Sequence, residues 1–496
     1  MSARTLGTLL DELHILANGR HPAALALPLT GVALDTREIR PGDVFLALRG
    51  ASDHGYWHAA RAIEAGAAAI LAEAPLPTDA TLPNAVPVLV TNELRPRVAG
   101  IAERVYRAPS AALDIVGVTG TNGKTSTVQF IAQGAELLGR RAATQGTLGA
   151  GPVGRLVPGQ RTTPDICATQ RFLADMRSGG VDTVAMEVSS HALMQGRVER
   201  VQFDVAVYTQ LSRDHLDYHG DMESYFQAKA RLFAWPGLSH AVINLDCPWG
   251  RRLVSMTRAS VTGYSAAGEP GAQIAAEDLV LESDGMRFTL RCDGVRLPVR
   301  TQLIGRFNVD NLLAACGALQ GLGATPAQLA QIVPQLQPVP GRMNRLGGGA
   351  LPLVVVDYAH TPDAIAKALA TLREHAPRQL TIVFGCGGER DRGKRPQMAA
   401  AAEAGADRVL LTDDNPRGED GDRIVADARA GFRRPGLVLV ERDRRRAIER
   451  AINEAMRGDI VLIAGKGHEP YQEVAGRVLP FDDRQVAAEC LQRRAA

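Results

Sequence analysis

The sequence predicts an α/β protein of three domains, two of them built around mostly parallel sheets. Its 496 residues are enough for about three domains of ordinary size. Short apolar runs alternate with helical stretches along most of the chain, which is typical of parallel strands joined by crossover helices. The composition breaks at residues 107–110 and at the Pro- and Gly-rich segment 338–349. We therefore expect domains at residues 1–108, 109–339 and 340–496.

The bulk composition is that of a soluble globular protein. Hydrophobic residues make up 45% of the chain and charged residues 22%, and the formal net charge is only +2. So small a charge favours neither nucleic acid nor a membrane surface as a partner. The N-terminal segment lacks the apolar core of a signal peptide, and no apolar run reaches the roughly 18 residues of a membrane span. We expect a cytoplasmic monomer.

The cysteines exclude several kinds of site. Six of them lie far apart in the chain, and none belongs to a C-x-x-C pair. This spacing argues against a zinc site and against a thioredoxin-like redox motif. A disulfide framework is also not expected in a long chain with so few cysteines, which favours a reducing compartment.

The first two predicted domains differ in their strand patterns. In the smaller N-terminal α/β domain, residues 1–20 form an amphipathic helical pattern, and apolar runs separated by helical stretches follow. The central domain has apolar runs typical of a parallel sheet, followed by alternating, hairpin-like segments over residues 260–300, which we interpret as a β insertion or edge. The strands are expected at residues 44–48, 67–71, 87–90, 113–118, 182–188, 203–209 and 240–245.

The third domain is predicted to be doubly wound and Rossmann-like. Apolar runs alternate there with Ala-rich helical segments, and ligands of such sheets bind at the carboxyl ends of the strands. The arginines of residues 442–446 fall in a helical stretch and are interpreted as a solvated face. The strands are expected within residues 353–360, 380–385, 408–414, 437–442 and 460–465, and polar clusters follow them at residues 357–360, 385–392, 413–417 and 465–469.

A glycine-rich loop, GVTGTNGKTS at residues 117–126, connects a predicted strand to a predicted helix. Glycines let backbone N–H groups face phosphates, and the helix N-terminus adds a positive dipole. Lys124 would reach the β- and γ-phosphates, and the Thr125 hydroxyl would bind Mg²⁺. The strict phosphate-loop pattern has Gly where this chain has Val118, so the loop is a variant. A plain Gly-rich turn is the alternative. The predicted nucleotide-binding residues are Gly120, Thr121, Asn122, Gly123, Lys124, Thr125 and Ser126.

Three further residues are candidates for metal chemistry. Glu187 follows a strand beside the phosphate loop and is placed to hold Mg²⁺, although a capping role explains it equally well. His215 lies in the polar segment 213–220, where a lone histidine is more often structural than a metal ligand. Lys229 is flanked by aromatic residues that bury one helix face, so a snorkelling lysine is the simpler interpretation than a reactive amine.

Taken together, these motifs resemble the Mur ligase family over nearly the whole chain. TGTNGKT (119–125), MEVSSHAL (186–193), RDHLDYHG (213–220), FNVDNLLAA (307–315), PGRM (340–343) and DYAHTPDA (357–364) match the family in order. The resemblance is strongest to the members that add the third amino acid of the muropeptide. It implies an N-terminal UDP-binding domain, a central ATPase domain and a C-terminal domain for the incoming amino acid.

The resemblance also implies roles for individual residues. Glu187 and His215 match magnesium ligands. Lys229 falls where the family carries a carbamylated lysine, which would hold the second of two Mg²⁺ ions with carbon dioxide as its modifying group. Asn308, Asn311 and Arg342 match positions near the nucleotide. The positions that match contacts to the UDP-linked substrate are Leu34, Thr36, Thr162, Thr163, Ser189, Gln195 and Arg197.

The C-terminal motifs indicate which amino acid is added. In the family, Asp-Asn-Pro-Arg, here residues 414–417, marks enzymes that select meso-diaminopimelate, which differs from lysine by one carboxylate. Arg417 offers a planar fork for that group, and an unpaired Arg would reject lysine. Asp414 and Glu469 could accept hydrogen bonds from the distal ammonium. The implied amino-acid site comprises Arg390, Asp414, Asn415, Pro416, Arg417, Gly465 and Glu469.

The implied reaction joins meso-diaminopimelate to UDP-N-acetylmuramoyl-L-alanyl-D-glutamate in peptidoglycan synthesis. The D-glutamyl carboxylate attacks the γ-phosphate of ATP, and the amine then displaces phosphate from the acyl phosphate. Lys124, Lys229 and His215 are the implied catalytic residues, with His360 a candidate base. Three alternatives remain: a lysine-adding ligase, a folylpolyglutamate synthetase, and a nucleotide-gated binding protein without turnover. Asp-Asn-Pro-Arg argues against the first two, and the retained metal and phosphate residues against the third.

Overall fold

The computed structural model describes residues 5–18, 22–50, 53–81, 85–282, 285–341, 343–467 and 469–495. They divide into two compact units, one of residues 1–264 and 314–324 and the other of residues 265–313 and 325–496. The predicted domain boundaries after residues 108 and 339 stay predictions. Among the described residues, no helix is both long enough and apolar enough to span a bilayer.

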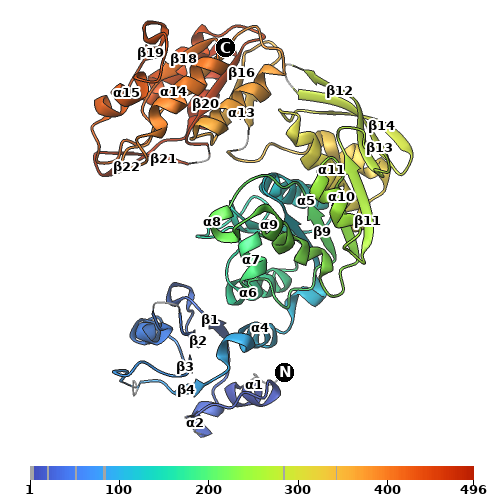
Figure 1. The fold of residues 1–496 in the computed structure, drawn as a ribbon, viewed down its shortest axis with the longest axis vertical. Helices are drawn as coiled ribbons and strands as arrows, with labels where there is room; N and C mark the ends of the chain where they lie inside the picture. Colours follow the sequence, from blue (N-terminus) through green and yellow to red (C-terminus); the bar gives the residue numbers. More distant parts are fainter. Residues whose placement is uncertain are drawn as a thin grey trace. The chain divides into compact units, whose positions relative to one another are not determined.

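The first unit begins with a four-stranded parallel sheet in the order β1-β2-β3-β4 (Figure 1). Its strands are continuous apolar runs because both faces are covered, as the separate clusters around Leu46 and Phe45 show. The predicted N-terminal helix is shorter than its pattern and ends at Glu12. The elements are α1 (Leu6–Glu12), α2 (Pro22–Leu25), β1 (Gly31–Ala33), β2 (Asp43–Ala47), α3 (Ala59–Glu64), β3 (Ala69–Glu73), β4 (Val88–Thr91) and α4 (Leu94–Val105).

The same unit contains a second sheet, with strands in the order β11-β10-β9-β5-β8-β6-β7. The neighbours β10, β9, β5, β8 and β6 pair in parallel, and β7 closes the edge as an antiparallel hairpin with β6. The carboxyl ends of β5 and β8 therefore lie side by side. The strands are β5 (Asp114–Thr119), β6 (Ala142–Gly146), β7 (Gly149–Pro152), β8 (Thr183–Glu187), β9 (Val205–Tyr208), β10 (His240–Asn244) and β11 (Ser260–Ser265).

Helices cover this sheet, and several begin at side chains that hydrogen-bond to their first turn. Asp165, Ser189 and Asp221 accept from backbone N–H groups at the starts of α6, α7 and α9. Such caps fix where the following segment leaves the sheet, which positions the residues of the site. The helices are α5 (Lys124–Leu137), α6 (Ile166–Ser178), α7 (Ser190–Met194), α8 (Leu216–His219), α9 (Met222–Ala230) and α10 (Pro248–Val254).

The second unit opens with three strands that pair antiparallel, as the alternating pattern of residues 260–300 predicts. Two helices follow, and the first of them, α11, extends into residues assigned to the other unit. These elements are β12 (Ile274–Glu282), β13 (Gly285–Cys292), β14 (Val295–Thr301), α11 (Phe307–Gly321) and α12 (Pro326–Ile332).

The rest of the second unit is a doubly wound domain with the strand order β15-β16-β20-β17-β18-β19. All neighbours are parallel except the antiparallel pair at β15. Alternate residues of β16 enter two clusters: Val355 packs with Ile365 of α13 (Pro362–Arg373), and Val354 packs with Ile448 of α16 (Arg444–Glu454). The strands are β15 (Asn344–Gly347), β16 (Leu353–Asp357), β17 (Leu380–Phe384), β18 (Arg408–Leu411), β19 (Leu439–Val440), β20 (Ile460–Ala464), β21 (Tyr471–Val474) and β22 (Arg477–Pro480).

The interpretation of residues 442–446 as a solvated face is wrong for Arg444. Its guanidinium is fully buried and forms two hydrogen bonds with Asp483, of 2.8 and 2.7 Å. Arg444 also donates to the Ala464 carbonyl at the end of β20, so it connects α16, α17 and the sheet. The helices of this domain are α13 (Pro362–Arg373), α14 (Lys394–Gly405), α15 (Gly421–Arg429), α16 (Arg444–Glu454) and α17 (Asp483–Ala495).

Candidate active site

The glycine-rich loop lies between β5 and α5, as its sequence predicts. Gly120 and Gly123 have φ values of +149° and +86°, and a Cβ on Gly120 would lie 1.9 Å from Thr209 Oγ1. Lys124 begins α5, and its Nζ folds back to donate to the carbonyls of Gly120 and Thr121 at 3.0 and 2.9 Å. The loop therefore places a cation and the backbone N–H groups of a helix start at one point, which is the arrangement that binds phosphates.

Glu187 ends the neighbouring strand β8 and is 1% exposed. The Thr125 hydroxyl donates to its Oε1 at 3.0 Å, and the Thr147 backbone N–H donates to the same oxygen at 2.7 Å. A Cβ on Gly146 would lie 2.3 Å from that oxygen, so only glycine leaves room for the carboxylate. The structure thus brings the predicted metal residues Thr125 and Glu187 into contact. Sequence reasoning missed Thr147, because nothing near it in the chain forms a motif.

Lys229, on α9, is 1% exposed, so the interpretation of it as a snorkelling lysine is wrong. Its Nζ donates to the Gly120 carbonyl at 2.9 Å and lies 4.5 Å from the centre of the Tyr225 ring. Burial, followed by the charge of Lys124, holds the pKa of the Lys229 amine well below its usual range. The amine is therefore neutral over more of the physiological pH range than an exposed lysine.

His215 precedes α8 with a left-handed backbone, φ +53°, and its side chain is half exposed. Its Nε2 lies 3.4 Å from the Asp214 carboxylate, and its ring centre lies 6.2 Å from that of Tyr225. Tyr225 is therefore a shared neighbour of His215, a predicted magnesium ligand, and Lys229, which is predicted to hold the second ion as a carbamate.

Most residues predicted to contact the UDP-linked substrate gather at the end of β8. Thr163 Oγ1 donates to the Glu187 carbonyl at 2.7 Å and accepts from the Ser189 N–H at 3.2 Å. Arg197 donates to the Thr163 carbonyl at 3.0 Å and also to the Gln195 side chain. Burial and then the neighbouring Arg161 lower the pKa of Arg197, so this cluster favours an anionic ligand.

The remaining residues of that predicted set lie near this cluster or in the N-terminal sheet domain. Thr162 Oγ1 is 3.2 Å from Thr147 Oγ1, which connects it to Glu187. Leu34 and Thr36 follow β1, and Arg171 of α6 donates to the neighbouring carbonyls of Val32 and Glu38 at 3.1 and 2.6 Å. Arg171 therefore fixes this segment against the helix that follows Thr162 and Thr163.

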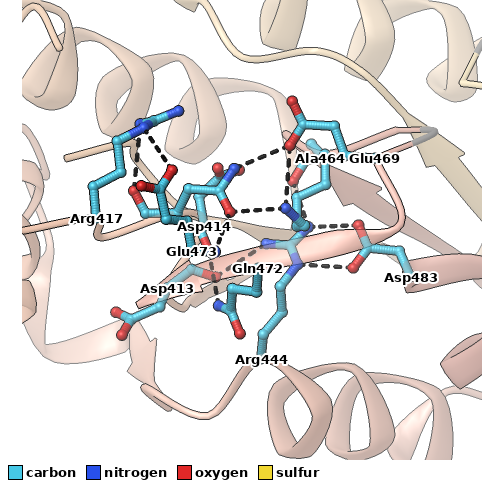
Figure 2. Close-up of polar contacts among 11 residues, drawn as sticks. Asp413, Asp414, Arg417, Arg444, Ala464, Glu469, Gln472, Glu473 and Asp483 are labelled. Atoms are coloured by element: carbon cyan, nitrogen blue, oxygen red, sulfur yellow. Dashed lines mark hydrogen bonds and ion pairs between the residues drawn. The ribbon is translucent and has the colours of Figure 1, made fainter. Parts of the chain in front are cut away.

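In the second unit, a buried polar network forms at the carboxyl ends of β18 and β20 (Figure 2). Lys466 is fully buried, and its Nζ donates to Asn415 Oδ1 at 3.0 Å and to Glu469 Oε2 at 3.1 Å. Asn415 Nδ2 donates to the same Glu469 oxygen at 3.0 Å. Burial raises the pKa of Asp414, and a Cβ on Gly465, at φ +115°, would lie 2.4 Å from Asp414 Oδ2. Lys466 therefore orients residues of the predicted amino-acid site without having been predicted.

Arg417 lies at the edge of this network with a left-handed backbone, φ +56°. Its Nη1 donates to the Gly388 carbonyl at 2.8 Å, and its Nε lies 3.4 Å from Glu473 Oε2. A Cβ on Gly387 would lie 3.1 Å from Arg417 Nη1 and 3.6 Å from Arg390 Cγ, so both predicted arginines flank that glycine. The planar guanidinium expected at Arg417 is therefore present, and its Nη1 already donates a hydrogen bond to the protein backbone.

Two loops of this site are held together by a buried ion pair. Arg395 is fully buried and donates to both oxygens of Glu419, at 2.9 and 2.7 Å, and to the Gly387 carbonyl at 3.2 Å. Glu419 also accepts from the Glu389 N–H at 3.0 Å. These contacts fix the loop of Arg390 against the turn of Arg417. The positions are far apart in the chain, so the sequence alone did not indicate them.

The structure does not join every predicted residue to one site. Asn308 and Asn311 hydrogen-bond to each other at 3.1 Å and belong to the unit that does not contain the glycine-rich loop. His360 is exposed, and its Nδ1 lies 2.8 Å from the Tyr358 carbonyl. Arg342 lies outside the described residues.

Comparisons with known proteins agree with this geometry. Three family models match: Mur ligase family, catalytic domain, at residues 28–107; Mur ligase middle domain at 118–319; and Mur ligase, glutamate ligase domain, at 341–467. The chain is 55% identical over 469 residues to a UDP-N-acetylmuramoyl-L-alanyl-D-glutamate--2,6-diaminopimelate ligase of Xanthomonas campestris pv. campestris strain 8004, and 94% of each chain is covered. The chain belongs to the Mur ligase family.

Two further matches span nearly the whole Mur ligase chain. A relative of the same name from Pseudomonas putida strain KT2440 is 50% identical, with 93% of this chain and 94% of the relative covered. A solved structure of a ligase of that name superposes with a TM-score of 0.75 at 37% identity, covering 98% of this chain and 99% of the other. The predicted family and the predicted α/β class with largely parallel sheets are confirmed.

In this Mur ligase, replacing Gly146 with alanine is expected to lower activity by about 10- to 100-fold, because the new Cβ would displace the Glu187 carboxylate from Thr125 and Thr147. The measurement is phosphate release against Mg²⁺ concentration, where half-maximal activity should require more Mg²⁺. Gly436→Ala is the control, since a Cβ there meets nothing within 4 Å. Equal activity in the two variants would contradict the role given to Glu187.

Glu419 is expected to make the ligase sensitive to acid. Hydrogen bonds from Arg395, followed by the Glu389 N–H, lower the Glu419 pKa from 4.5 to about 2. Because the folded-state pKa is lower than the unfolded one, this stabilisation is present above pH about 4.5 and is lost as the pH falls towards about 2. Thermal unfolding of wild type and Glu419→Gln should therefore differ most near neutral pH and converge in acid. A constant difference in Tm would contradict this assignment.

Proposed function

We propose that this chain is an ATP-dependent ligase that joins meso-diaminopimelate to UDP-N-acetylmuramoyl-L-alanyl-D-glutamate. The observation that carries the proposal is the C-terminal network, in which Arg417 presents a guanidinium beside the buried Asn415 and Lys466 and the partly exposed carboxylate of Glu469. An amino acid with both an ammonium and a carboxylate at its distal centre matches this pairing of a carboxylate and a guanidinium. The names of the relatives, which align over nearly the whole chain, support the same substrate.

ATP fits the glycine-rich loop of the first unit. The backbone N–H groups at the start of α5 and the Lys124 ammonium would neutralise the β- and γ-phosphates. Lys124 now donates to two loop carbonyls, and it would exchange those contacts for phosphate oxygens. The D-glutamyl carboxylate attacks the γ-phosphate of ATP. ADP departs as the leaving group, and the product is an acyl phosphate.

Mg²⁺ fits the oxygen atoms that gather beside this loop. The Thr125 hydroxyl and the buried Glu187 carboxylate are in contact, and both are oxygen ligands of the kind that Mg²⁺ prefers. His215 and a carbamate on Lys229 would hold a second ion. Within the described residues, no three His, Cys, Asp or Glu side chains form a metal cluster, and Mg²⁺ usually retains waters and phosphate oxygens among its ligands. When bound, Mg²⁺ neutralises charge on the transferred phosphoryl group.

The second half of the reaction needs a neutral amine. The amine of diaminopimelate attacks the acyl carbon, phosphate leaves, and a base takes the proton that the new amide nitrogen releases. His360 is the proposed base. It lies beside Tyr358, which also contacts the loop of Glu469, so it borders the amino-acid site. We place the enzyme in the cytoplasm as a monomer.

Phosphate release by the purified chain tests the proposal. The assay contains ATP, Mg²⁺ and UDP-N-acetylmuramoyl-L-alanyl-D-glutamate, with meso-diaminopimelate, with L-lysine, or with no amino acid. We expect phosphate release only in the mixture that contains diaminopimelate. Equal release with lysine would retain the ligase and refute its specificity, and no release from any mixture would refute the proposed reaction.

A further inference from the structure

We infer that the Glu473 carboxylate competes with the distal carboxylate of the incoming amino acid for Arg417, and that this competition sets the affinity for that substrate. The inference rests on the proposed function and concerns a residue outside the predicted site. Glu473 lies on the hairpin of β21 and β22, next to Arg417 in space (Figure 2).

The backbone of Glu473 is fixed against the turn that carries Arg417. Its N–H donates to Asn415 Oδ1 at 2.9 Å, and its carbonyl accepts from the Arg417 N–H at 2.9 Å. Gln472 adds a third connection by donating to the Asp414 carbonyl at 2.7 Å. The Glu473 side chain therefore always begins at the same place relative to Arg417.

The carboxylate of Glu473 is held far less firmly. It is one third exposed, and its contact with Arg417 Nε is 3.4 Å long, beyond the usual hydrogen-bond length. The neighbouring Glu469 differs, because its Oε2 accepts from both Asn415 and Lys466. Of the two carboxylates, Glu473 is therefore the one that can move away without breaking a hydrogen bond.

The nitrogens of Arg417 explain why the two carboxylates would compete. Nη1 is engaged by the Gly388 carbonyl, and Nε faces Glu473, whereas Nη2 forms no hydrogen bond or ion pair with any described residue. A substrate carboxylate that binds through two nitrogens must use Nη2 together with one of the engaged nitrogens. Nε is the easier choice, because its present contact is the longer one. A substrate carboxylate at Nε and Nη2 would lie next to the Glu473 carboxylate on the same guanidinium. Because the two negative charges repel each other, the Glu473 side chain must move away.

The competition has opposite consequences for two amino acids. Diaminopimelate displaces Glu473 and loses part of its binding energy in doing so. Lysine has no distal carboxylate, so Glu473 remains on Arg417 and keeps that guanidinium paired. Removing the charge of Glu473 is therefore expected to help diaminopimelate and not lysine.

The test compares wild type with Glu473→Gln, which keeps the shape of the side chain and removes its charge. The KM for diaminopimelate should fall about two- to fivefold, the range of a partly exposed ion pair, with kcat and the KM for ATP unchanged. The KM for lysine, or its inhibition constant if it is not a substrate, should stay the same or rise. Glu441→Gln is the matched control, because Glu441 also forms a partly exposed 3.4 Å pair with an arginine, Arg446.

Two results would overturn the inference. The first is a KM for diaminopimelate that is unchanged or raised in Glu473→Gln, which would mean that Glu473 does not compete or that it helps to orient Arg417. The second is an equal fall in KM when Glu473→Gln is made in an Arg417→Lys background, because a competitor acting through the Arg417 fork loses its effect there. Failure of the proposed function would look different, since wild type itself would then release no phosphate with diaminopimelate.

Discussion

Replacing Lys229 with alanine is expected to reduce ligase turnover by about 10²- to 10³-fold while leaving binding of the UDP-linked substrate intact. Lys229 is buried, and its amine has a pKa well below the usual range because of burial and the charge of Lys124. A neutral amine reacts with carbon dioxide and releases a proton to form a carbamate, so the side chain becomes an anion. That anion would lie beside the Gly120 carbonyl and the phosphate loop, where Mg²⁺ is proposed to bind.

The measurement separates chemistry from binding. Phosphate release reports turnover, and calorimetric titration with UDP-N-acetylmuramoyl-L-alanyl-D-glutamate reports binding at the separate cluster of Thr163 and Arg197. Lys367→Ala is the control, since that lysine is exposed and pairs with the exposed Asp363.

Chemical rescue makes the Lys229 prediction specific to a carbamate. Added formate could occupy the space left by the side chain and restore part of the activity of Lys229→Ala, because it supplies the missing carboxylate. Full activity of Lys229→Ala without any added acid would refute the carbamate. Lost activity together with lost substrate binding would instead indicate a folding defect.

The sequence predicts the buried strands well because their chemistry is local. Runs of branched apolar residues between polar ends can only be covered on both faces, as in β16 and β20. The hairpin of β6 and β7 was missed because its residues are small and include several glycines, which do not alternate between apolar and polar. The hairpin of β21 and β22 was missed because none of its residues is buried, so its polar and apolar residues do not mark a face that packs on the core.

The residues of the candidate site are likewise of two kinds, those with a local sequence signal and those without one. Lys124 could be predicted from the glycines around it, whereas the aromatic neighbours of Lys229 predicted only a buried helix face, and its role came from the family resemblance. The residues that hold the site residues in place could not be predicted, because they are distant in the sequence. Thr147 lies 40 residues from Glu187, and Arg444 lies 39 residues from Asp483. Only the paired strands and packed helices bring such residues together, so a buried arginine resembles a solvated one in the sequence.

Replacing Arg417 with lysine is expected to lower kcat/KM for diaminopimelate by about 10²- to 10³-fold, because two charge-assisted hydrogen bonds to one carboxylate become at most one. Lysine at this position keeps the positive charge but loses the planar fork. The backbone there is left-handed, φ +56°, and both side chains carry a Cβ, so the substitution adds no new backbone strain. The loss should therefore come from the side chain.

The same variant tests where selectivity originates. In wild type, L-lysine leaves Arg417 paired with Glu473 and gains no contact from the guanidinium, whereas the distal carboxylate of diaminopimelate binds it. In Arg417→Lys, the more mobile ammonium can remain solvated, so kcat/KM for L-lysine should change little while that for diaminopimelate falls. Arg446→Lys, at an exposed arginine of the same domain, is the control. An equal fall in kcat/KM for both amino acids would mean that Arg417 fixes the shape of the turn through Gly388 and does not bind the distal carboxylate. The selectivity would then have to come from the network of Asn415, Lys466 and Glu469.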